Sequence, residues 1–499
     1  MKIANIMNFV RYIDEREEDS TRKLFEMTAQ ELEMVNEFGF ENTFLLQYDA
    51  VIDENYQKLF KEKATDKTEL GLWLEIVEPL TSACGLPYNS ENGWKWDWHI
   101  IPGFSMAYTP HEREMLIDEA MRKFREVFGY YPKTVASWVI DTHTINYLAE
   151  NYDISALAIC RDQVSTDAYT LIGGYFNQAY YPSKNNMFTP AQTEEMRLDV
   201  PMFRLLGPCP IHNYEFEKYL SDDVKKHHLC CTLEPVWMTG YVPEFVDSLL
   251  RTFYKNEDLG FSYAQFGQEN SFGSGCLPAL RMQFEKLSEM KDVNVMKMGD
   301  TGEWFKNTFP DKTPATSVVA LDNWDSEDIQ AAYYDCQKYT SNIIRFEDRV
   351  FIRSLFLFDD DNKDLYIKDT CTTFDAIYEN LPIIDTLRSS VGEKRNCGLV
   401  IDTDASEFDA VKEDDGVLKI YWNDKAVIFD ENKITVVSDK LCFYTGTMKV
   451  IAKGNTLIYN NKGIDYSLRI ESAVVSVLES GDIEIIPNNG ECELYPEKY

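Results

Sequence analysis

The spacing of apolar residues changes once along this chain, near residue 313, and that change restricts the folds available to it. Up to about residue 310, short apolar runs alternate with amphipathic helical stretches. This alternation is typical of βα units built around a parallel sheet. Beyond Thr313, short runs with a period of two are separated by turn clusters such as 414–416 and 460–463, a pattern typical of a β-sandwich. The sequence therefore predicts an α/β domain followed by a β-sandwich.

Individual elements can be predicted from local signals. The runs predicted as strands are 3–9, 43–48, 70–76, 99–106, 134–140, 154–160, 203–206, 229–233 and 261–266. Thr109, Pro110 and Glu112 form a capping box with proline at the first helical position, so a helix is expected from there to Gly129. A second helix is expected over 20–38. We expect three parts: a barrel domain over 1–312, a connector with helical character over 313–345, and a β-sandwich over 346–499.

Composition restricts the classes of binding partner and the cellular compartment that are expected. The formal net charge of −35 disfavours nucleic acid and anionic lipid surfaces, whereas a neutral saccharide is compatible with it. The first eleven residues do not resemble a signal peptide, and no apolar run approaches the ~18 residues of a membrane span. The eleven cysteines lack a CxxC pair, which favours reduced thiols and a cytoplasmic location. A homo-oligomer assembled through the β domain is a further expectation.

Acidic residues at the ends of apolar runs are the first candidates for chemistry, because the carboxyl ends of parallel strands surround the substrate face of a barrel. The acids in this position are Asp49, Glu75, Asp141, Glu234 and Glu269. Paired carboxylates in different environments are what glycosidic bond cleavage requires. The alternative for each acid is that it caps the following helix or pairs with an arginine.

Aromatic and amide residues accompany these acids, as expected of a site that stacks on sugar rings and binds hydroxyls. The candidate substrate-binding residues near the acids are Trp73, Trp138, His143, Trp237, Gln268 and Asn270, with Trp98 and His99 after an alternating Trp94, Trp96, Trp98 pattern. That pattern predicts either a stacking platform or a packed surface. The long excursion 160–190 adds Arg161, Gln163, Asp167, Tyr180, Tyr181 and Asn185.

A bound cofactor is not predicted. Asp49, His99 and His143 are the residues that a divalent metal would use, but no HxxxH or HxH spacing accompanies them. Metal dependence therefore remains an alternative to a metal-free site.

The order of the segments NFVR, TFLLQYDA, LGLWLEI and SWVIDTHTINYLAENYDISALAICRDQ resembles the seven-stranded (β/α) barrels of polysaccharide deacetylases and of glycoside hydrolase families 38 and 57. The resemblance covers roughly residues 1–310, and the β-rich tail resembles the C-terminal β domains of the hydrolases. It implies a (β/α)7-type parallel barrel followed by a β-sandwich. By position it implies Asp141 as nucleophile and Glu269 as acid, with Glu234 as a rival for either role. Asn8 and Arg11 stand at the first strand, where the deacetylases carry an Asp-Asp motif, so Arg11 joins the candidate substrate-binding residues.

These observations together predict a glycoside hydrolase that uses paired carboxylates on short saccharides. The alternatives are a metal-dependent, deacetylase-like hydrolase and a saccharide-binding protein without catalytic activity. The sequence does not choose among sugars or linkages.

Overall fold

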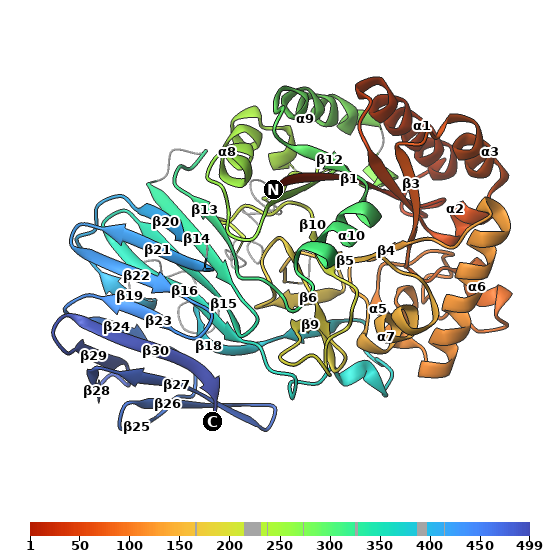
Figure 1. The fold of residues 1–499 in the computed structure, drawn as a ribbon. Helices are drawn as coiled ribbons and strands as arrows, with labels where there is room; N and C mark the ends of the chain where they lie inside the picture. Colours follow the sequence, from red (N-terminus) through yellow and green to blue (C-terminus); the bar gives the residue numbers. More distant parts are fainter. Residues whose placement is uncertain are drawn as a thin grey trace.

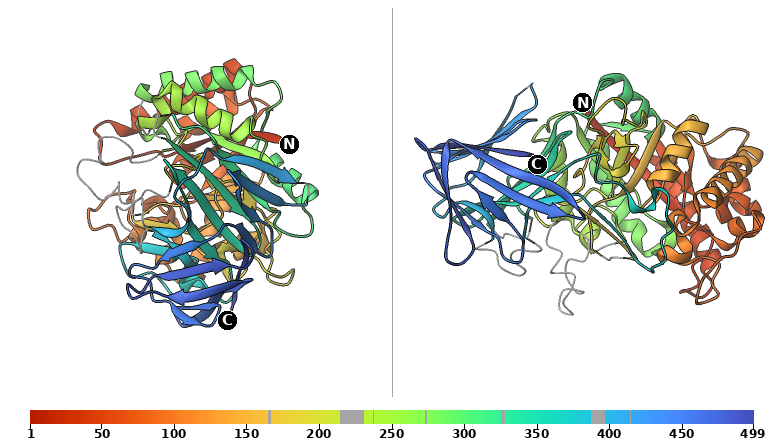
Figure 2. Two further views of the ribbon diagram at one scale, coloured as in Figure 1. Left: turned by 90° about the vertical axis from the view of Figure 1, so that its left-hand side faces the viewer. Right: turned by 90° about the horizontal axis from the view of Figure 1, so that it is seen from below.

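The computed structural model describes residues 1–164, 167–213, 231–236, 238–272, 274–324, 328–386, 397–413 and 415–499. An α/β domain with a curled, mostly parallel sheet forms the N-terminal part, and two antiparallel sheets form the C-terminal part (Figure 1). The two parts lie side by side when seen from below (Figure 2). The predicted fold class is confirmed.

The parallel sheet is a half-barrel whose strands run in the order β11-β1-β2-β3-β4-β5-β10, with β7 antiparallel to β10 and β12 parallel to β1. Its strands are β1 (Lys2–Val10), β2 (Asn42–Leu46), β3 (Thr68–Trp73), β4 (Thr134–Ala136), β5 (Ala156–Cys160), β7 (Ala179–Tyr180), β10 (Met202–Leu205), β11 (Ser262–Phe266) and β12 (Asn294–Met296). Small sheets formed by β6 (Tyr169–Ile172), β8 (Pro182–Ser183) and β9 (Asn186–Pro190) lie beside it. Parallel strands bring their carboxyl ends to one edge, where the candidate site lies.

Helices surround the half-barrel, and each turns an apolar face inward. They are α1 (Ser20–Phe38), α2 (Tyr48–Ile52), α3 (Glu54–Lys63), α4 (Glu78–Ala83), α5 (Ile100–Gly103), α6 (Pro110–Phe128), α7 (Thr142–Asn151), α8 (Pro243–Tyr254), α9 (Leu277–Glu289) and α10 (Met298–Thr308). The predicted capping box of α6 is confirmed, since the Thr109 hydroxyl accepts from the Glu112 N–H and Gly129 ends the helix at φ +87°. Within the described ranges, none of the helices combines the length and apolar character needed to traverse a bilayer.

One predicted strand is wrong. Residues 99–106 form α5 and the 3₁₀ turn Ser105–Ala107 instead of a strand. Pro102 lies inside this apolar run and has no N–H to give to a strand ladder, so the run is buried as helical turns. Of the predicted strand 229–233, residues 229 and 230 lie outside the described residues, and Thr232 makes an isolated antiparallel bridge with Pro208.

The C-terminal part is a β-sandwich. One sheet runs β13-β14-β15-β16-β19-β24-β29-β28, with β18 on β16, and the other runs β20-β21-β22-β23-β30-β27-β26-β25. The strands are β13 (Thr316–Ala320), β14 (Ile329–Asp335), β15 (Tyr339–Phe346), β16 (Arg349–Leu357), β18 (Leu381–Asp385), β19 (Gly398–Asp402), β20 (Asp409–Glu413), β21 (Val417–Trp422), β22 (Lys425–Phe429), β23 (Ile434–Val437), β24 (Leu441–Tyr444), β25 (Ile451–Lys453), β26 (Thr456–Asn461), β27 (Ile464–Glu471), β28 (Ala473–Val477), β29 (Ile483–Pro487) and β30 (Glu491–Lys498). Side chains from both sheets, such as Ile343 and Leu418, share one apolar core.

The predicted helical connector over 313–345 is wrong, because β13, β14 and most of β15 occupy it. The reason is visible in β14, every residue of which is buried. Ala331 and Tyr333 pack with the helices and strands of the half-barrel, whereas Ala332 and Tyr334 pack with the second sheet. A strand buried on both faces loses the polar alternation that would identify it.

A segment of the C-terminal part crosses back onto the half-barrel, so the predicted division at residue 346 does not separate two self-contained domains. We call residues 359–380 the return segment. Its strand β17 (Ala376–Glu379) pairs in parallel with β6. Upstream, the Phe374 carbonyl accepts from the Ile100 N–H at 3.1 Å, and the Cys371 N–H donates to the Met106 carbonyl at 2.7 Å.

Candidate active site

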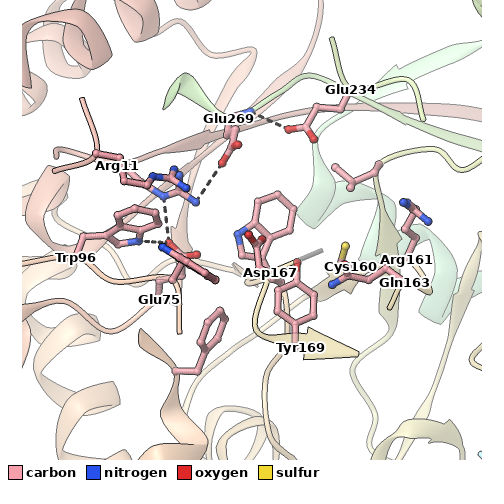
Figure 3. Close-up of a pocket in the computed structure, with 15 residues that line it drawn as sticks. Arg11, Glu75, Trp96, Cys160, Arg161, Gln163, Asp167, Tyr169, Glu234 and Glu269 are labelled. Carbon is pink, nitrogen blue, oxygen red and sulfur yellow. Dashed lines mark hydrogen bonds and ion pairs between the residues drawn. The ribbon is translucent and has the colours of Figure 1, made fainter. Parts of the chain in front are cut away.

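A pocket lies at the edge of the half-barrel where the parallel strands end. Its cavity volume is about 160 Å³. Arg11 follows β1, Glu75 follows β3, and Glu269 follows β11. The lining residues are Arg11, Arg16, Glu75, Trp96, Trp98, Phe104, Trp138, Cys160, Arg161, Gln163, Asp167, Tyr169, Leu206, Glu234 and Glu269 (Figure 3).

Arg11 joins two of the acids in this pocket. Its Nε lies 3.3 Å from Glu75 Oε2, and its Nη2 lies 3.1 Å from Glu269 Oε2. Glu75 Oε2 also accepts from Gln47 Nε2 at 2.7 Å and from Trp96 Nε1 at 3.0 Å (Figure 3). Because three donors converge on one oxygen, Glu75 is firmly anchored. One guanidinium facing two carboxylates leaves this group net negative.

The position of Arg11 is fixed from behind the pocket. Its N–H donates to Asn270 Oδ1 at 3.0 Å, and its carbonyl accepts from Asn270 Nδ2 at 2.9 Å and from the Tyr56 hydroxyl at 3.1 Å. Its guanidinium carbon lies 4.2 Å from the centre of the Trp96 ring. Such stacking of a cation on an indole adds to the ion pairs.

Asp167 and Glu234 complete the set of acids in the pocket. Glu234 is 2% exposed, and its Oε1 accepts from the Glu269 N–H at 3.1 Å. Figure 3 shows Asp167 between the Arg11 group and the side of the pocket that carries Cys160 and Gln163. Burial, with the negative charges of Glu269 and Glu75, raises the pKa of Asp167 to about 6, against the opposing charges of Arg11 and Arg16.

Glu269 has a related environment. Burial raises its pKa above the ordinary value, while Arg11 and Arg16 oppose that shift. Arg16 is itself held by Asp14, whose Oδ2 lies 2.6 Å from the Arg16 Nη2. The pocket therefore contains one carboxyl group, that of Asp167, that can hold a proton near neutral pH beside the anchored side chain of Glu75.

Aromatic side chains form the remaining walls. Trp98, Phe104, Trp138 and Tyr169 line the pocket. Trp138 is supported from below by Trp73, since their ring centres lie 4.9 Å apart at an interplanar angle of 82°. These faces can stack on the apolar face of a sugar ring.

The structure brings about half of the sequence candidates to this pocket. Those that line it are Arg11, Glu75, Trp98, Trp138, Arg161, Gln163, Asp167, Glu234 and Glu269. Those that do not are Asp49, Trp73, His99, Asp141, His143, Tyr180, Tyr181, Asn185, Gln268 and Asn270. Trp237 lies outside the described residues.

Asp141 is the main correction. It lies away from the pocket and caps α7, since its Oδ1 accepts from the Thr144 N–H at 3.0 Å. The same oxygen lies 2.9 Å from Arg113 Nη1, and Ser105 donates to its Oδ2 at 2.6 Å. Both ion-pair side chains are fully buried. The helix-capping alternative describes this residue, and the structure does not present it as a nucleophile.

The other residues outside the pocket have structural neighbours of their own. Trp73 is fully buried beneath Trp138, and Asn270 holds the backbone of Arg11. Gln268 Nε2 donates to Glu31 Oε1 at 3.1 Å. His143 Nε2 lies 3.1 Å from Glu114 Oε1, and His99 Nδ1 lies 2.8 Å from Asp97 Oδ1. Asp49 lines a separate pocket.

Sequence reasoning ranked several lining residues too low. Trp96 was visible in the alternating tryptophans, and Asp167 in the long excursion after β5, but neither stands at a strand end. Arg16 lies in a loop and carried no signal at all. Trp94, by contrast, shares the alternation with Trp96 and Trp98 but does not line the pocket.

No family model matches this sequence, and no curated protein matches it. Solved structures do match. A provisionally assigned glycoside hydrolase/deacetylase from Parabacteroides distasonis superposes with a TM-score of 0.52 at 12% identity, covering 76% of this chain and 90% of that one. This similarity shows that the chain shares the fold of that protein.

Two further structures are similar at lower scores. A provisionally assigned polysaccharide deacetylase from Mycobacterium smegmatis has a TM-score of 0.38 at 13% identity, covering 61% of this chain and 90% of that one. An α-amylase from Thermotoga maritima has a TM-score of 0.32 at 12% identity, covering 60% and 74%.

The sequence left metal dependence open as an alternative, and the donor atoms of the described side chains bear on it. Among the residues that the structure describes, no three His, Cys, Asp or Glu side chains are grouped as metal ligands. Asp49, His99 and His143, the set considered from sequence, are each held elsewhere. Between Glu75 and Glu269 the cation is a guanidinium. The described residues therefore do not fit a metal centre, and we derive no step through one.

Proposed function

We propose that this protein is a carbohydrate-active hydrolase that cleaves a glycosidic bond with paired carboxyl groups in this pocket. The observation that carries the proposal is the cluster of acids around Arg11, with Glu75 at 3.3 Å and Glu269 at 3.1 Å from a single guanidinium. A carboxylate held beside the reacting carbon suits the oxocarbenium-like transition state of glycoside cleavage. The fold supports this class of chemistry only by analogy.

Asp167 is the proton donor in this proposal. A carboxyl group with a pKa near the working pH is the best general acid, and burial places the pKa of Asp167 at about 6. The carboxylates of Glu269 and Glu75 keep the proton on Asp167, because two neighbouring negative charges disfavour a third.

Glu269 is the carboxylate that faces the developing positive charge. Its ion pair with Arg11 opposes the effect of burial and favours its charged form. Glu75 acts through Arg11. Gln47 and Trp96 hold the Glu75 carboxyl group in place, and this group in turn fixes the Arg11 guanidinium and hence the orientation of Glu269. Trp98 and Trp138 position the ring by stacking on its apolar face.

The assignment is tested by comparing substrates with good and poor leaving groups. In Asp167→Asn, hydrolysis of unactivated oligosaccharides should fall by about 10²–10⁴-fold, the usual contribution of general acid catalysis, whereas nitrophenyl glycosides should be hydrolysed at near wild-type rates. Glu269→Gln should lose activity toward both. The wild-type kcat/KM on oligosaccharides should decline as pH rises through about 6, and Asp167→Asn should remove that decline.

Asp153→Asn is the matched control, because its side chain is 86% exposed and lies outside the pocket. It should hydrolyse both substrate types at wild-type rates. Wild-type activity in Asp167→Asn and Glu269→Gln toward every substrate would overturn the proposal. Sugar binding without turnover in the wild-type protein would likewise replace it with a binding function.

A further inference from the structure

Three aromatic rings form a row that begins in the active-site pocket and ends at the protein surface. Trp98 lines the pocket, whereas His99 and Phe374 lie outside it. The His99 ring stacks on Trp98, with ring centres 3.9 Å apart and an interplanar angle of 26°. Phe374 contacts the His99 ring at a steep angle of 73°, with centres 5.2 Å apart. We call Trp98, His99 and Phe374 the aromatic row.

Phe374 is the exposed end of this row. It is 41% exposed although it is a large apolar side chain. A single exposed apolar residue is ordinary on a protein surface and needs no explanation. Phe374 differs because it is joined, through His99, to a side chain of the pocket wall. The aromatic surface of the active site therefore continues outward beyond the pocket.

The backbone that carries Phe374 is anchored on both sides. The Phe374 carbonyl accepts from the Ile100 N–H at 3.1 Å, and two residues later the Ala376 N–H donates to the Ala168 carbonyl at 3.0 Å. Because this backbone is already ordered, the ring loses little conformational freedom when a ligand stacks on it.

His99 is held by a buried acid. Its Nδ1 lies 2.8 Å from Asp97 Oδ1, which also accepts from the His99 N–H at 3.1 Å, and the Ser90 hydroxyl donates to Asp97 Oδ2 at 2.7 Å. The side chain of His99 is 27% exposed. With Nδ1 facing a carboxylate, Nε2 is the ring nitrogen left to accept a hydrogen bond from a ligand hydroxyl.

We propose that Phe374 and His99 bind a second sugar residue of the saccharide whose first residue lies in the pocket against Trp98. The apolar face of the second ring stacks on Phe374, and one of its hydroxyls donates to His99 Nε2. The choice of a sugar as ligand rests on the proposed hydrolase function. The aromatic row narrows that function, because it makes the preferred substrate an oligosaccharide and not a glycoside of a single sugar.

Calorimetric titration of full-length Asp167→Asn tests the proposal without turnover of the ligand. The probes are maltotriose, cellotriose, xylotriose and triacetylchitotriose, each compared with its own monosaccharide. At least one trisaccharide should bind about three- to tenfold more tightly than its monosaccharide, the usual worth of one aromatic stacking contact. If no trisaccharide binds more tightly than its monosaccharide, the proposal is overturned.

Variants on the Asp167→Asn background locate the second sugar. Phe374→Ala should remove the advantage of the trisaccharide and leave binding of the monosaccharide unchanged. Phe374→Tyr keeps the ring and should keep the advantage. Tyr421→Ala is the control, because it removes an aromatic side chain that is 37% exposed on the β-sandwich and outside the pocket, and it should bind both ligands normally. Equal weakening of both ligands by Phe374→Ala would mean that the ring only shapes the pocket, and it would overturn the proposal.

Kinetics of Phe374→Ala in the otherwise wild-type protein separate this inference from the hydrolase proposal. Its kcat/KM on the trisaccharide that binds should fall about three- to tenfold, with nitrophenyl glycosides of a single sugar unaffected. Hydrolysis of the trisaccharide at an unchanged rate overturns the inference and leaves the hydrolase proposal standing. Trisaccharide binding that depends on Phe374, in a wild-type protein without hydrolytic activity, overturns the hydrolase proposal and supports the second sugar site.

Discussion

Glu31 lies on the inner face of α1 as a fully buried acid behind the active-site pocket. Gln268 Nε2 donates to its Oε1 at 3.1 Å, and burial raises its pKa to about 8. The folded protein therefore keeps a proton that the unfolded chain loses above its ordinary pKa of 4.5. Between about pH 4.5 and 8 this residue should lower the free energy of unfolding by about 1.4 kcal/mol per pH unit. Glu31→Gln should flatten that dependence and stabilise the protein at pH 8.

Urea denaturation at pH 5 and pH 8 measures this effect. Glu33→Gln is the control, because Glu33 lies on the same helix and is exposed. The control should keep the wild-type dependence of unfolding free energy on pH. An unchanged dependence in Glu31→Gln would show that Glu31 is already ionised in the folded state.

Position at a strand end was a sufficient signal for Glu75 and Glu269, because parallel strands impose a common edge. Glu234 follows the isolated antiparallel bridge between Thr232 and Pro208 instead. The same signal misplaced Asp141. Its neutralising partner Arg113 comes from α6, and the carbonyl of Asp369 in the return segment accepts from that arginine at 2.8 Å. A contact across more than 200 residues leaves no trace in the local sequence. The position of Glu75 and Glu269 at strand ends was therefore predictable, whereas the buried arginine that neutralises Asp141 was not.

At the scale of elements, the pairing of β6 with β17 holds the loop that carries Asp167. The Ala376 N–H donates to the Ala168 carbonyl at 3.0 Å, one residue beyond Asp167. Ala376→Pro removes this hydrogen bond and should loosen the loop. We expect kcat/KM on oligosaccharides to fall at least tenfold, with a smaller loss on nitrophenyl glycosides, which do not need the acid.

Ile377→Pro provides the comparison, because alternate residues of a parallel strand donate to the partner strand, and Ala376 and Asn380, which donate toward β6, have the parity opposite to that of Ile377. Its side chain is 56% exposed, so the proline ring has room. It should retain most of the wild-type activity. Equal losses in both variants, or in neither, would show that the pairing does not position Asp167.

Local sequence signals located some helices correctly but missed some strands, because such signals report only on nearby residues. The cap of α6 and the αL glycine that ends α1 are recognised by residues within one turn, so both helices were located correctly. β14 is buried on both faces, and its composition therefore resembles that of a helix as much as that of a strand. β17 pairs with a strand about 200 residues earlier, so the sequence placed it wholly in the second domain.

At the scale of the molecule, the half-barrel and the sandwich share an apolar layer. Val318, Tyr333 and Phe351 of the first sandwich sheet pack in one cluster with Phe245 and Leu249 of α8. The Phe176 ring, which follows β6, stacks on Tyr333 with centres 3.8 Å apart and an interplanar angle of 9°. Neither part can bury this layer without the other. The described structure should therefore unfold as one cooperative unit.

Phe176→Ala tests this cooperativity. Removing a buried aromatic ring should lower the free energy of unfolding by about 3–5 kcal/mol, and scanning calorimetry should show one transition moved to lower temperature. Val474→Ala, at a position 61% exposed on β28, should leave the transition in place. Two resolved transitions, of which Phe176→Ala moves one, would show that the half-barrel and the sandwich fold independently. A single transition that moves as a whole would show that loss of packing in the shared layer destabilises the half-barrel and the sandwich together.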